Sequence, residues 1–375
     1  MKHKQYMEMA LELAARGFGN VEPNPMVGCV IVDADGNVIG SGWHKTYGKE
    51  HAEINALADC RKRGHNPAGA TMCVTLEPCC HHGKTPPCAE AIIKAGISKV
   101  VIAMLDPSDK VAGKGVKMLE DAGIKVSIGL CEKKARLLNP AFIKHSTKSL
   151  PWVVLKWAQT IDGKLSAAGL PEDQRWISNE ASRKDVHKLR RSCQGILVGI
   201  ETALIDDPLL TARPAKSRTP LRIVVDSKFR IRTDLKMFGT IQDADLLIVT
   251  TKKAFDNDME KASKIVELGA EVLAVDADDD GRCDLHQLLE NLGKSGVQRL
   301  LVEGGAKVIS SFIGKGIADE AVVYIAPKLF ASLGDVNMSD SLSEIKELPQ
   351  LFDTTTGIFD GDVKFTGNFR RHELI

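Results

Sequence analysis

Two short segments of the sequence combine the residue types of a catalytic zinc site. His51, Ala52 and Glu53 form the first segment, and Cys79 and Cys88 flank a loop in the second. One imidazole and two thiolates are three zinc ligands, and a site with three protein ligands keeps a fourth position for water. Glu53 would take a proton from that water and deliver it to a leaving group. We therefore predict that the His and both Cys bind the metal and that Glu53 is catalytic.

The spacing of these residues indicates where the ligands lie on local structure. His51 and Glu53 are two positions apart, and a regular helix would splay such residues by roughly 200°. The chain must therefore be just entering a helix there, and the amphipathic run at 54–61 agrees. Cys79 follows a proline, and Cys88 opens another periodic segment. We expect ligands at the starts of two adjacent helices, whose positive dipole ends favour thiolate and hydroxide.

The order of these motifs carries a family resemblance. The pattern H-x-E followed by P-C-x-x-C marks zinc-dependent base deaminases. This chain has the first half intact and a longer second half, P-C-(x8)-C, with the interior His-His-Gly-Lys-Thr-Pro-Pro at 81–87. In this it resembles the bifunctional riboflavin-biosynthesis deaminase and reductase. The resemblance implies an α/β fold, with a cytidine-deaminase-like three-layer domain followed by a dihydrofolate-reductase-like α/β domain, and the cofactors Zn²⁺ and NADPH.

Three further residues of the loop are chemically able to bind metal, namely Cys80, His81 and His82. In the resembled family the position of Cys80 is usually Ser and is not a ligand, which favours Cys79. A closed structural zinc knuckle is the alternative for the whole cluster, but a knuckle would leave Glu53 without a role.

Two residues upstream are candidates for the deaminase pocket. Asn24 lies between two prolines, and Asn-Pro is a common turn pair, so it could be a turn residue only. The resemblance places it in the pocket, with its amide aimed at the pyrimidine edge. His44 would contact substrate or cap the loop, because the site already has three ligands.

Composition limits the class of protein. The 375 residues are 43% hydrophobic and 26% charged, which predicts a soluble globular protein of two domains. A net charge of +1 gives no long-range field to gather nucleic acid or an anionic membrane. The first helix lacks the apolar stretch of a signal peptide or membrane span, so we expect a cytoplasmic protein. Nine scattered cysteines imply no disulfide framework.

The order of predicted elements divides the chain. Strands alternate with helices from 70 to 128, which argues for a sheet covered on both faces. The loops at 106–107 and 113–115 follow strand ends and carry no specific signal. Periodicity breaks near 148, where Pro151 precedes a new apolar strand. We therefore predict a deaminase domain at 1–148 and a reductase domain at 149–375.

Two basic residues of the second half have competing interpretations. Lys156 lies in the strand 151–158, where base rates favour a solvent-facing side chain because burying the charge is costly. The resemblance instead makes Lys156 catalytic, reaching the ribose that is reduced. Arg190 ends a predicted helix at 179–191, which Ser178 or Asn179 could cap. It would be a surface charge by default, and the resemblance makes it substrate-binding.

The other reductase residues are implied by the resemblance, in segments that resemble its signatures at 201–213 and 300–309. Two glycines at a helix start suit a phosphate, although the pattern G-x-G-x-x-G is missing. The implied cofactor-binding residues are Ala158, Trp176, Thr202, Asp206, Ser227, Gly305, Ala306 and Lys307. The implied substrate-binding residues, besides Asn24 and Arg190, are Leu210, Arg213 and Glu303. The segment 171–174 departs from the family, and Gln174 replaces a substrate-contacting Ser.

The sequence thus predicts a two-step enzyme. It would deaminate 2,5-diamino-6-(5-phosphoribosylamino)pyrimidin-4-one and then reduce the ribosyl side chain to ribityl with NADPH, as a homodimer or homotetramer without nucleic-acid or membrane partners. The alternative is a zinc nucleobase or nucleic-acid deaminase with a non-catalytic binding domain. That alternative needs a basic stripe with stacking aromatics, and aromatics are only 5% of the chain. A zinc-stabilised interaction protein is disfavoured by the open ligand position.

Overall fold

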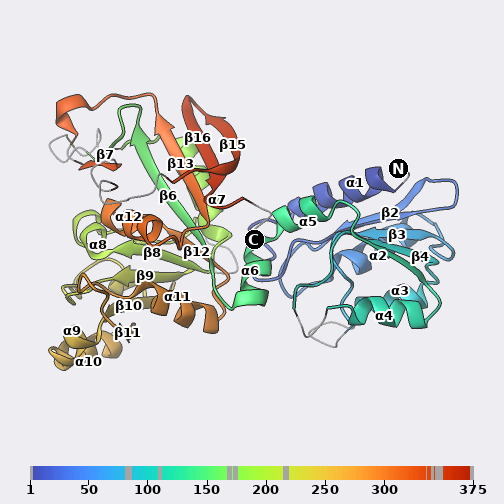
Figure 1. Cartoon of the computed structure of the whole chain (residues 1–375), viewed down its shortest axis with the longest axis horizontal. Coiled ribbons are helices and arrows are strands. Elements are labelled where there is room, and N and C mark those ends of the chain that lie inside the picture. The colour runs from blue at the N-terminus through green and yellow to red at the C-terminus, as the bar shows by residue number, and fades with distance from the viewer. Residues whose placement is uncertain are drawn as a thin grey trace. The chain divides into compact units, whose positions relative to one another are not determined.

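The computed structural model describes residues 3–80, 87–108, 112–166, 171, 176–213, 219–334, 336–338, 342 and 349–371. The chain divides into two compact units, Met1–Lys148 and Ser149–Ile375 (Figure 1). The predictions about His81, His82 and Gln174 lie outside the described residues.

The first unit is built on a five-stranded sheet in the order β2-β1-β3-β4-β5. β1 pairs antiparallel with β2 and β3, whereas β3, β4 and β5 are parallel. The chain turns between β1 and β2 at Gly36, whose φ of 93° favours glycine. The strands are β1 (Gly28–Val32), β2 (Val38–Trp43), β3 (Thr71–Val74), β4 (Lys99–Ile102) and β5 (Lys125–Ile128).

Helices cover both faces of this sheet because alternate strand residues point to opposite sides. On β1, Cys29 and Ile31 join the core that contains α2, α3 and α4, whereas Val30 and Val32 join the core that contains α1, α5 and α6. The expected three layers are confirmed. The helices are α1 (Lys4–Ala15), α2 (Ala52–Lys62), α3 (Cys88–Lys94), α4 (Lys114–Asp121), α5 (Glu132–Leu138) and α6 (Pro140–Lys148).

Two glycines of β2 let α2 approach the sheet closely. A Cβ atom at Gly42 would lie 2.4 Å from the backbone nitrogen of Ala56, and one at Gly40 would lie 2.6 Å from the Ala56 carbonyl oxygen. These distances are shorter than van der Waals contact, so a larger residue would push the helix away. The glycines therefore set the position of the helix whose first turn holds Glu53.

The second unit is built on a nine-stranded sheet in the order β11-β10-β9-β8-β12-β6-β13-β16-β15. The strands from β11 to β13 are parallel, and β16 and β15 continue the sheet antiparallel. A small separate sheet pairs β7 (Lys164–Ser166) with β14 (Val336–Asn337). The large sheet contains β6 (Trp152–Thr160), β8 (Gly195–Gly199), β9 (Leu221–Val225), β10 (Leu246–Thr251), β11 (Glu271–Val275), β12 (Arg299–Val302), β13 (Glu320–Ala326), β15 (Phe352–Phe359) and β16 (Asp362–Asn368).

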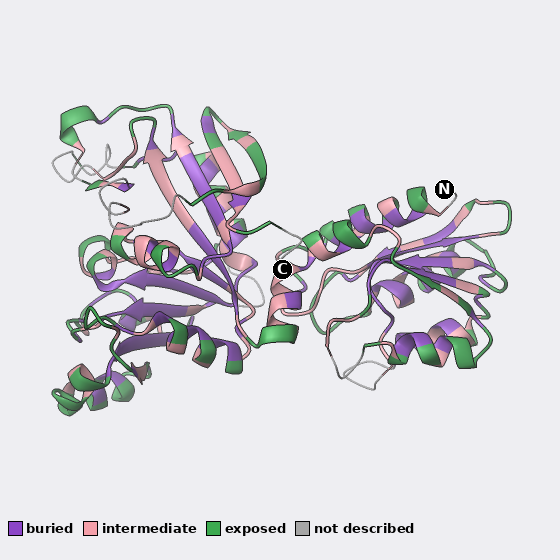
Figure 2. Ribbon diagram, viewed as in Figure 1, coloured by how far each residue is buried: buried purple, intermediate pink, exposed green. Residues whose placement is uncertain are grey.

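The parallel strands are apolar because the sheet is buried on both faces, as the burial colours show (Figure 2). All residues of β8 and of β10 are buried. The remaining elements are α7 (Glu180–Arg191), α8 (Ile200–Asp206), α9 (Lys252–Asp256), α10 (Met259–Glu267), α11 (Leu285–Lys294), α12 (Ala306–Gly314) and the 3₁₀ turns η2 (Phe238–Thr240) and η3 (Ala331–Leu333).

Between β10 and β11 the chain forms two helices, α9 and α10, because the Asp258 side chain accepts the N–H of Lys261 and starts a new helix. β15 forms the outer edge of the large sheet, beyond β16. Its Thr-rich, largely exposed sequence has no alternating apolar face that would predict a strand. Within the described ranges, no helix has the length and apolar character needed to cross a membrane.

Candidate functional site

The predicted metal ligands come together at the starts of two helices. His51 is the residue before α2, and Cys88 is the first residue of α3. The Nδ1 atom of His51 lies 3.6 Å from the Sγ of Cys79 and 3.3 Å from the Sγ of Cys88. The three donor atoms lie within 4.8 Å of one another, close enough to share one metal ion.

The electrostatics of this cluster call for a cation. A hydrogen bond from Cys88, together with His51, lowers the pKa of Cys79 to about 4. The interaction with Cys79, together with burial, in turn raises the pKa of Cys88, because a second negative charge beside the first is unfavourable. A divalent cation between the sulfur atoms removes this conflict by favouring both thiolates. The donor set therefore fits Zn²⁺.

Glu53 lies beside the ligands, in the first turn of α2. Its side chain is only 3% exposed and is within hydrogen-bonding reach of the Cys88 thiol. Burial raises the pKa of Glu53 to about 7. A carboxyl group with such a pKa can both accept and return a proton at neutral pH.

Asn24 and His44 form a hydrogen-bonded pair next to this cluster. The Nδ1 of the buried His44 lies 3.0 Å from the carbonyl oxygen of Glu50, and its Nε2 lies 3.2 Å from the Nδ2 of Asn24. Burial lowers the pKa of His44, so the ring is neutral and carries its proton on Nδ1. Nε2 then accepts from the Asn24 amide nitrogen, and this bond fixes the orientation of the Asn24 side chain. The His44 ring also meets His51 edge-on, with centroids 5.3 Å apart.

A second cluster of predicted residues lies in the other unit, around Arg190 and Glu303. The guanidinium donates to both carboxylate oxygens, with distances of 2.7 and 2.5 Å, and the two side chains are 15% and 8% exposed. Burial acts to raise the pKa of Glu303, but the ion pair outweighs it and lowers that pKa. The default interpretation of Arg190 as a surface charge is therefore wrong.

Lys156 of β6 belongs to the same cluster. Its side chain is half-buried, and burial lowers its pKa while Glu303 opposes the shift. Its Nζ lies 5.7 Å from the centre of the Tyr324 ring on the neighbouring strand β13. This distance allows a cation–π interaction, so the alternative of a fully solvent-facing Lys156 is wrong.

Tyr324 is held by two polar side chains that the sequence did not single out. Its hydroxyl donates to Asp185 Oδ2 at 2.7 Å, and the same oxygen accepts from Lys364 Nζ at 2.7 Å. Burial and the neighbouring Asp185 raise the pKa of Tyr324, so the hydroxyl stays a donor. Tyr324 lies in an apolar strand and Asp185 in a helix whose sequence is mostly polar, so no local pattern could have identified them.

The predicted substrate residues Leu210 and Arg213 lie on a segment that is hydrogen-bonded to α7. Arg190 Nη1 donates to the carbonyl oxygen of Thr211 at 2.9 Å, and the backbone N–H of Arg213 donates to His187 Nδ1 at 3.2 Å. Leu210 is buried and has a φ of 53°. The segment is thereby brought to the Arg190–Glu303 pair, although the roles of its residues remain predictions.

Several predicted cofactor residues gather where parallel strands end. Thr202 follows β8, and Gly305 precedes α12, whose first residues are Ala306 and Lys307. The Gly304–Gly305 peptide is cis, and a Cβ atom at Gly305 would lie 3.1 Å from the Thr202 hydroxyl. Because Gly305 has no Cβ atom, space remains between the Thr202 hydroxyl and the first N–H groups of α12. A phosphate of NADPH fits such a space at the start of a helix.

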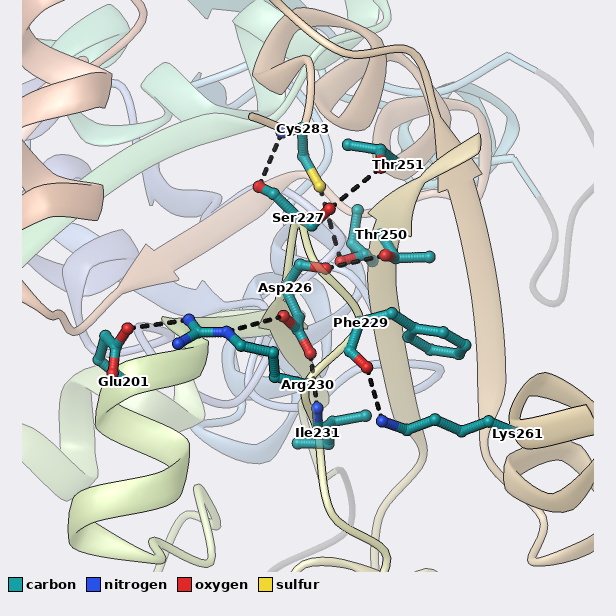
Figure 3. Close-up of polar contacts among 11 residues, drawn as sticks. Glu201, Asp226, Ser227, Phe229, Arg230, Ile231, Thr250, Thr251, Lys261 and Cys283 are labelled. Atoms are coloured by element: carbon teal, nitrogen blue, oxygen red, sulfur yellow. Dashed lines mark hydrogen bonds and ion pairs between the residues drawn. The ribbon is translucent and has the colours of Figure 1, made fainter. Parts of the chain in front are cut away.

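Ser227 follows β9, at the carboxyl end of that strand (Figure 3). Its hydroxyl accepts the N–H of Cys283 at 2.9 Å, and its carbonyl oxygen accepts from Thr251 at 3.0 Å. The buried Asp226 accepts the N–H of Ile231 at 2.6 Å and so holds the turn that presents Ser227. The position of Ser227 suits a cofactor contact, but its hydroxyl already accepts a hydrogen bond that stabilises the fold.

The other predicted cofactor residues have different surroundings. Trp176 is 59% exposed and stacks on Arg183, whose Cζ lies 4.7 Å from the ring centre. Ala158 packs in a small cluster with Ile177 and Phe330. Asp206 is the last residue of α8. Their contacts with cofactor remain predictions.

The ligand set predicts different results for two neighbouring cysteines. Cys79→Ser should lower the zinc content of the purified protein, because it removes a thiolate from the three-donor cluster. Cys80→Ser should keep the wild-type zinc content, and metal analysis of both variants measures the difference. Loss of zinc in Cys80→Ser but not in Cys79→Ser would show that the ligand was chosen wrongly.

Comparisons with known proteins agree with both halves of the chain. Residues 1–104 match the family model described as the cytidine and deoxycytidylate deaminase zinc-binding region, and residues 151–351 match the RibD C-terminal domain. These matches confirm the predicted fold class, and the two domains imply Zn²⁺ and NADPH as cofactors.

Relatives match over nearly the whole length. The riboflavin biosynthesis protein RibD of Aquifex aeolicus is 41% identical over 347 residues, which cover 92% of this chain and 93% of the relative. That of Escherichia coli is 38% identical over 88% of this chain and 89% of the relative. A crystal structure from Thermotoga maritima, described as a diaminohydroxyphosphoribosylaminopyrimidine deaminase/5-amino-6-(5-phosphoribosylamino)uracil reductase, is 35% identical with a TM-score of 0.81 over 98% of both chains. The chain therefore belongs to the RibD family of riboflavin biosynthesis proteins.

Proposed function

We propose that residues 1–148 carry out the deamination and residues 149–375 the reduction of this bifunctional riboflavin biosynthesis enzyme. The substrate is a small phosphoribosyl pyrimidine. We assign 2,5-diamino-6-(5-phosphoribosylamino)pyrimidin-4-one to the first unit and the deaminated uracil derivative to the second, following the activities that name the Thermotoga maritima relative. The observation that carries the deaminase assignment is a three-donor metal cluster beside the buried Glu53.

Deamination then needs one base and one orienting amide. Zn²⁺ held by His51, Cys79 and Cys88 would make the attacking water a stronger nucleophile. Glu53 accepts the proton of that water as the C–O bond forms, and returns it to the nitrogen as the C–N bond breaks and ammonia leaves. The oxygen of Asn24, fixed by His44, accepts a hydrogen bond from the pyrimidine.

In the reductase unit, bound NADPH would supply the hydride that reduces the ribosyl carbon bonded to the exocyclic amino nitrogen. Lys156 gives its proton to the sugar oxygen as the ring C–O bond opens, and its lowered pKa favours that transfer. Arg190 and Arg213 orient the sugar and its phosphate, with Glu303 and Leu210 completing the substrate site. The cofactor contacts are assigned to Ala158, Trp176, Thr202, Asp206, Ser227, Gly305, Ala306 and Lys307.

A nucleic-acid deaminase with a non-catalytic binding domain is not favoured. Residues 151–351 match a reductase-type domain of the RibD family, and the net charge of +1 gives no field to attract a polyanion. We also propose that the enzyme acts in the cytoplasm, where NADPH and phosphorylated metabolites are available.

The two-site assignment is tested by following ammonia release and NADPH absorbance separately. Glu53→Gln should lower the deamination rate by about 10²- to 10⁴-fold, the usual size of a lost general base. It should still oxidise NADPH at the wild-type rate with pre-deaminated substrate. Glu50→Gln removes a nearby exposed carboxylate and should change neither signal. If Glu53→Gln also stops reduction of pre-deaminated substrate, the two activities are not separate.

The Tyr324 ring should matter more than its hydroxyl for the reduction. Tyr324→Leu removes the aromatic face near the Lys156 ammonium, and we expect kcat of the reduction to fall roughly tenfold, the equivalent of one desolvated cation–π contact. Tyr324→Phe keeps the face and loses only the bond to Asp185, so it should retain most of kcat. Deamination by the same samples is the control. Equal losses in both variants would assign the effect to the hydroxyl.

We propose that the chain assembles as a homodimer or homotetramer through the outer edge of the large sheet. Ile358 of the edge strand β15 is 79% exposed and is the cross-strand partner of Val363. The unpaired backbone of an edge strand commonly pairs with another chain, and Ile358 adds exposed apolar surface at this edge. Ile358→Lys should therefore lower the mass measured by light scattering, whereas Val266→Lys, at an exposed apolar residue of α10, should not. An unchanged mass for Ile358→Lys would place the interface elsewhere.

A further inference from the structure

A buried carboxylate stands two residues before the metal ligand Cys79. The side chain of Glu77 is 4% exposed, and it accepts four hydrogen bonds from backbone N–H groups. Each carboxylate oxygen takes two of them. The donors to Oε2 are Asp106 at 3.1 Å and Gly113 at 3.0 Å, and the donors to Oε1 are Gly115 at 2.9 Å and Val116 at 3.2 Å.

These donors belong to the loop after β4 and to the beginning of α4. The first N–H groups of a helix have no partner within the helix and must find one elsewhere. Glu77 supplies that partner, and its negative charge suits the positive end of the helix dipole. The carboxylate therefore fastens the start of α4 to the end of the segment that leads to Cys79.

The same two segments are also in steric contact. A Cβ atom at Gly115 would lie only 2.1 Å from the carbonyl oxygen of Pro78, so only glycine allows this approach. Pro78 connects Glu77 to Cys79. The peptide that carries the ligand thus rests directly on the first turn of α4.

Helix α3 holds Cys79 by two further bonds. The backbone N–H of Ala89 donates to the Cys79 carbonyl oxygen at 3.1 Å, and the N–H of Cys88 donates to the Cys79 sulfur at 3.3 Å. Cys79 is therefore fixed by α3 directly and by α4 through Glu77 and Pro78. Loss of the Glu77 contacts would remove one of these two supports of Cys79.

We infer that Glu77 is a positioning residue for the metal centre, which sets the place of the Cys79 thiolate by locking the Pro78–Cys79 segment onto α4. This inference rests on the proposed role of Cys79 as a ligand. The residue type is specific for the task. A Gln has one acceptor oxygen and would turn an NH₂ group toward two N–H donors, which leaves those donors unpaired.

The test is the rate at which zinc leaves the full-length protein to a chromogenic chelator, well below the unfolding temperature. Glu77→Gln should release zinc roughly 10- to 100-fold faster, the usual effect of losing a residue that supports a ligand. Added zinc should restore kcat of the deamination, and the reductase rate should be unchanged. Asp33→Asn is the matched control, because Asp33 accepts a backbone N–H at the β1–β2 turn of the same unit. It should release zinc at the wild-type rate.

Wild-type zinc release by Glu77→Gln overturns the inference, even if the unfolding temperature falls, because the carboxylate then only stabilises the fold. If Glu77→Gln does not fold, Glu77→Asp is measured in the same way. It keeps the charge but is one methylene too short to reach all four donors, and a wild-type release rate again overturns the inference. Cys79→Ser tests separately the assumption that Cys79 is a metal ligand. Wild-type zinc release in that variant shows that Cys79 is not a ligand, whatever Glu77 does.

Discussion

The thiols of Cys79 and Cys88 both lie beside His51, and ionisation of one disfavours ionisation of the other. This conflict dominates the first unit, because the pKa of Cys79 is lowered and that of Cys88 is raised by the same contact. The surrounding structure keeps the two sulfur atoms close together. Gly42 lets α2 lie close to the sheet, and Glu77 fastens the segment before Cys79. A divalent cation bound to both sulfur atoms would favour the thiolate form of each.

In the second unit, buried charges are neutralised by other side chains of the protein. Arg190 and Glu303 neutralise each other through two hydrogen bonds, and Lys156 lies near the face of Tyr324. Removing one partner of such a pair would leave an uncompensated charge, which is far more costly than losing the whole pair. The reductase cluster is therefore expected to be formed before any substrate binds. In the deaminase cluster, by contrast, the charges of the ligands are balanced only by the metal.

The sequence predicted those parts of the fold and site that depend on local pattern. The metal ligands are recognisable because zinc chemistry needs particular residue types at short spacing, and the strands because their apolar runs are buried on both faces. The residues that it missed act over long separations. The Tyr324 hydroxyl bonds to Asp185, 139 positions away, and Glu77 bonds to Gly115, 38 positions away. For the same reason the sequence alone favoured a surface position for Arg190, because its partner Glu303 lies 113 positions further along the chain.

The same physical effect tunes the acid–base residues of both units in opposite directions. Desolvation disfavours the charged form of any group, so it raises the pKa of the buried Glu53 and lowers that of Lys156. Each shift moves the group toward neutral pH, where proton transfer to and from substrate is fastest. Burial is thus the common requirement of two unrelated reactions. It explains why the proposed deaminase base, Glu53, lies in the first turn of a packed helix and the proposed reductase acid, Lys156, lies in a sheet, rather than on exposed loops.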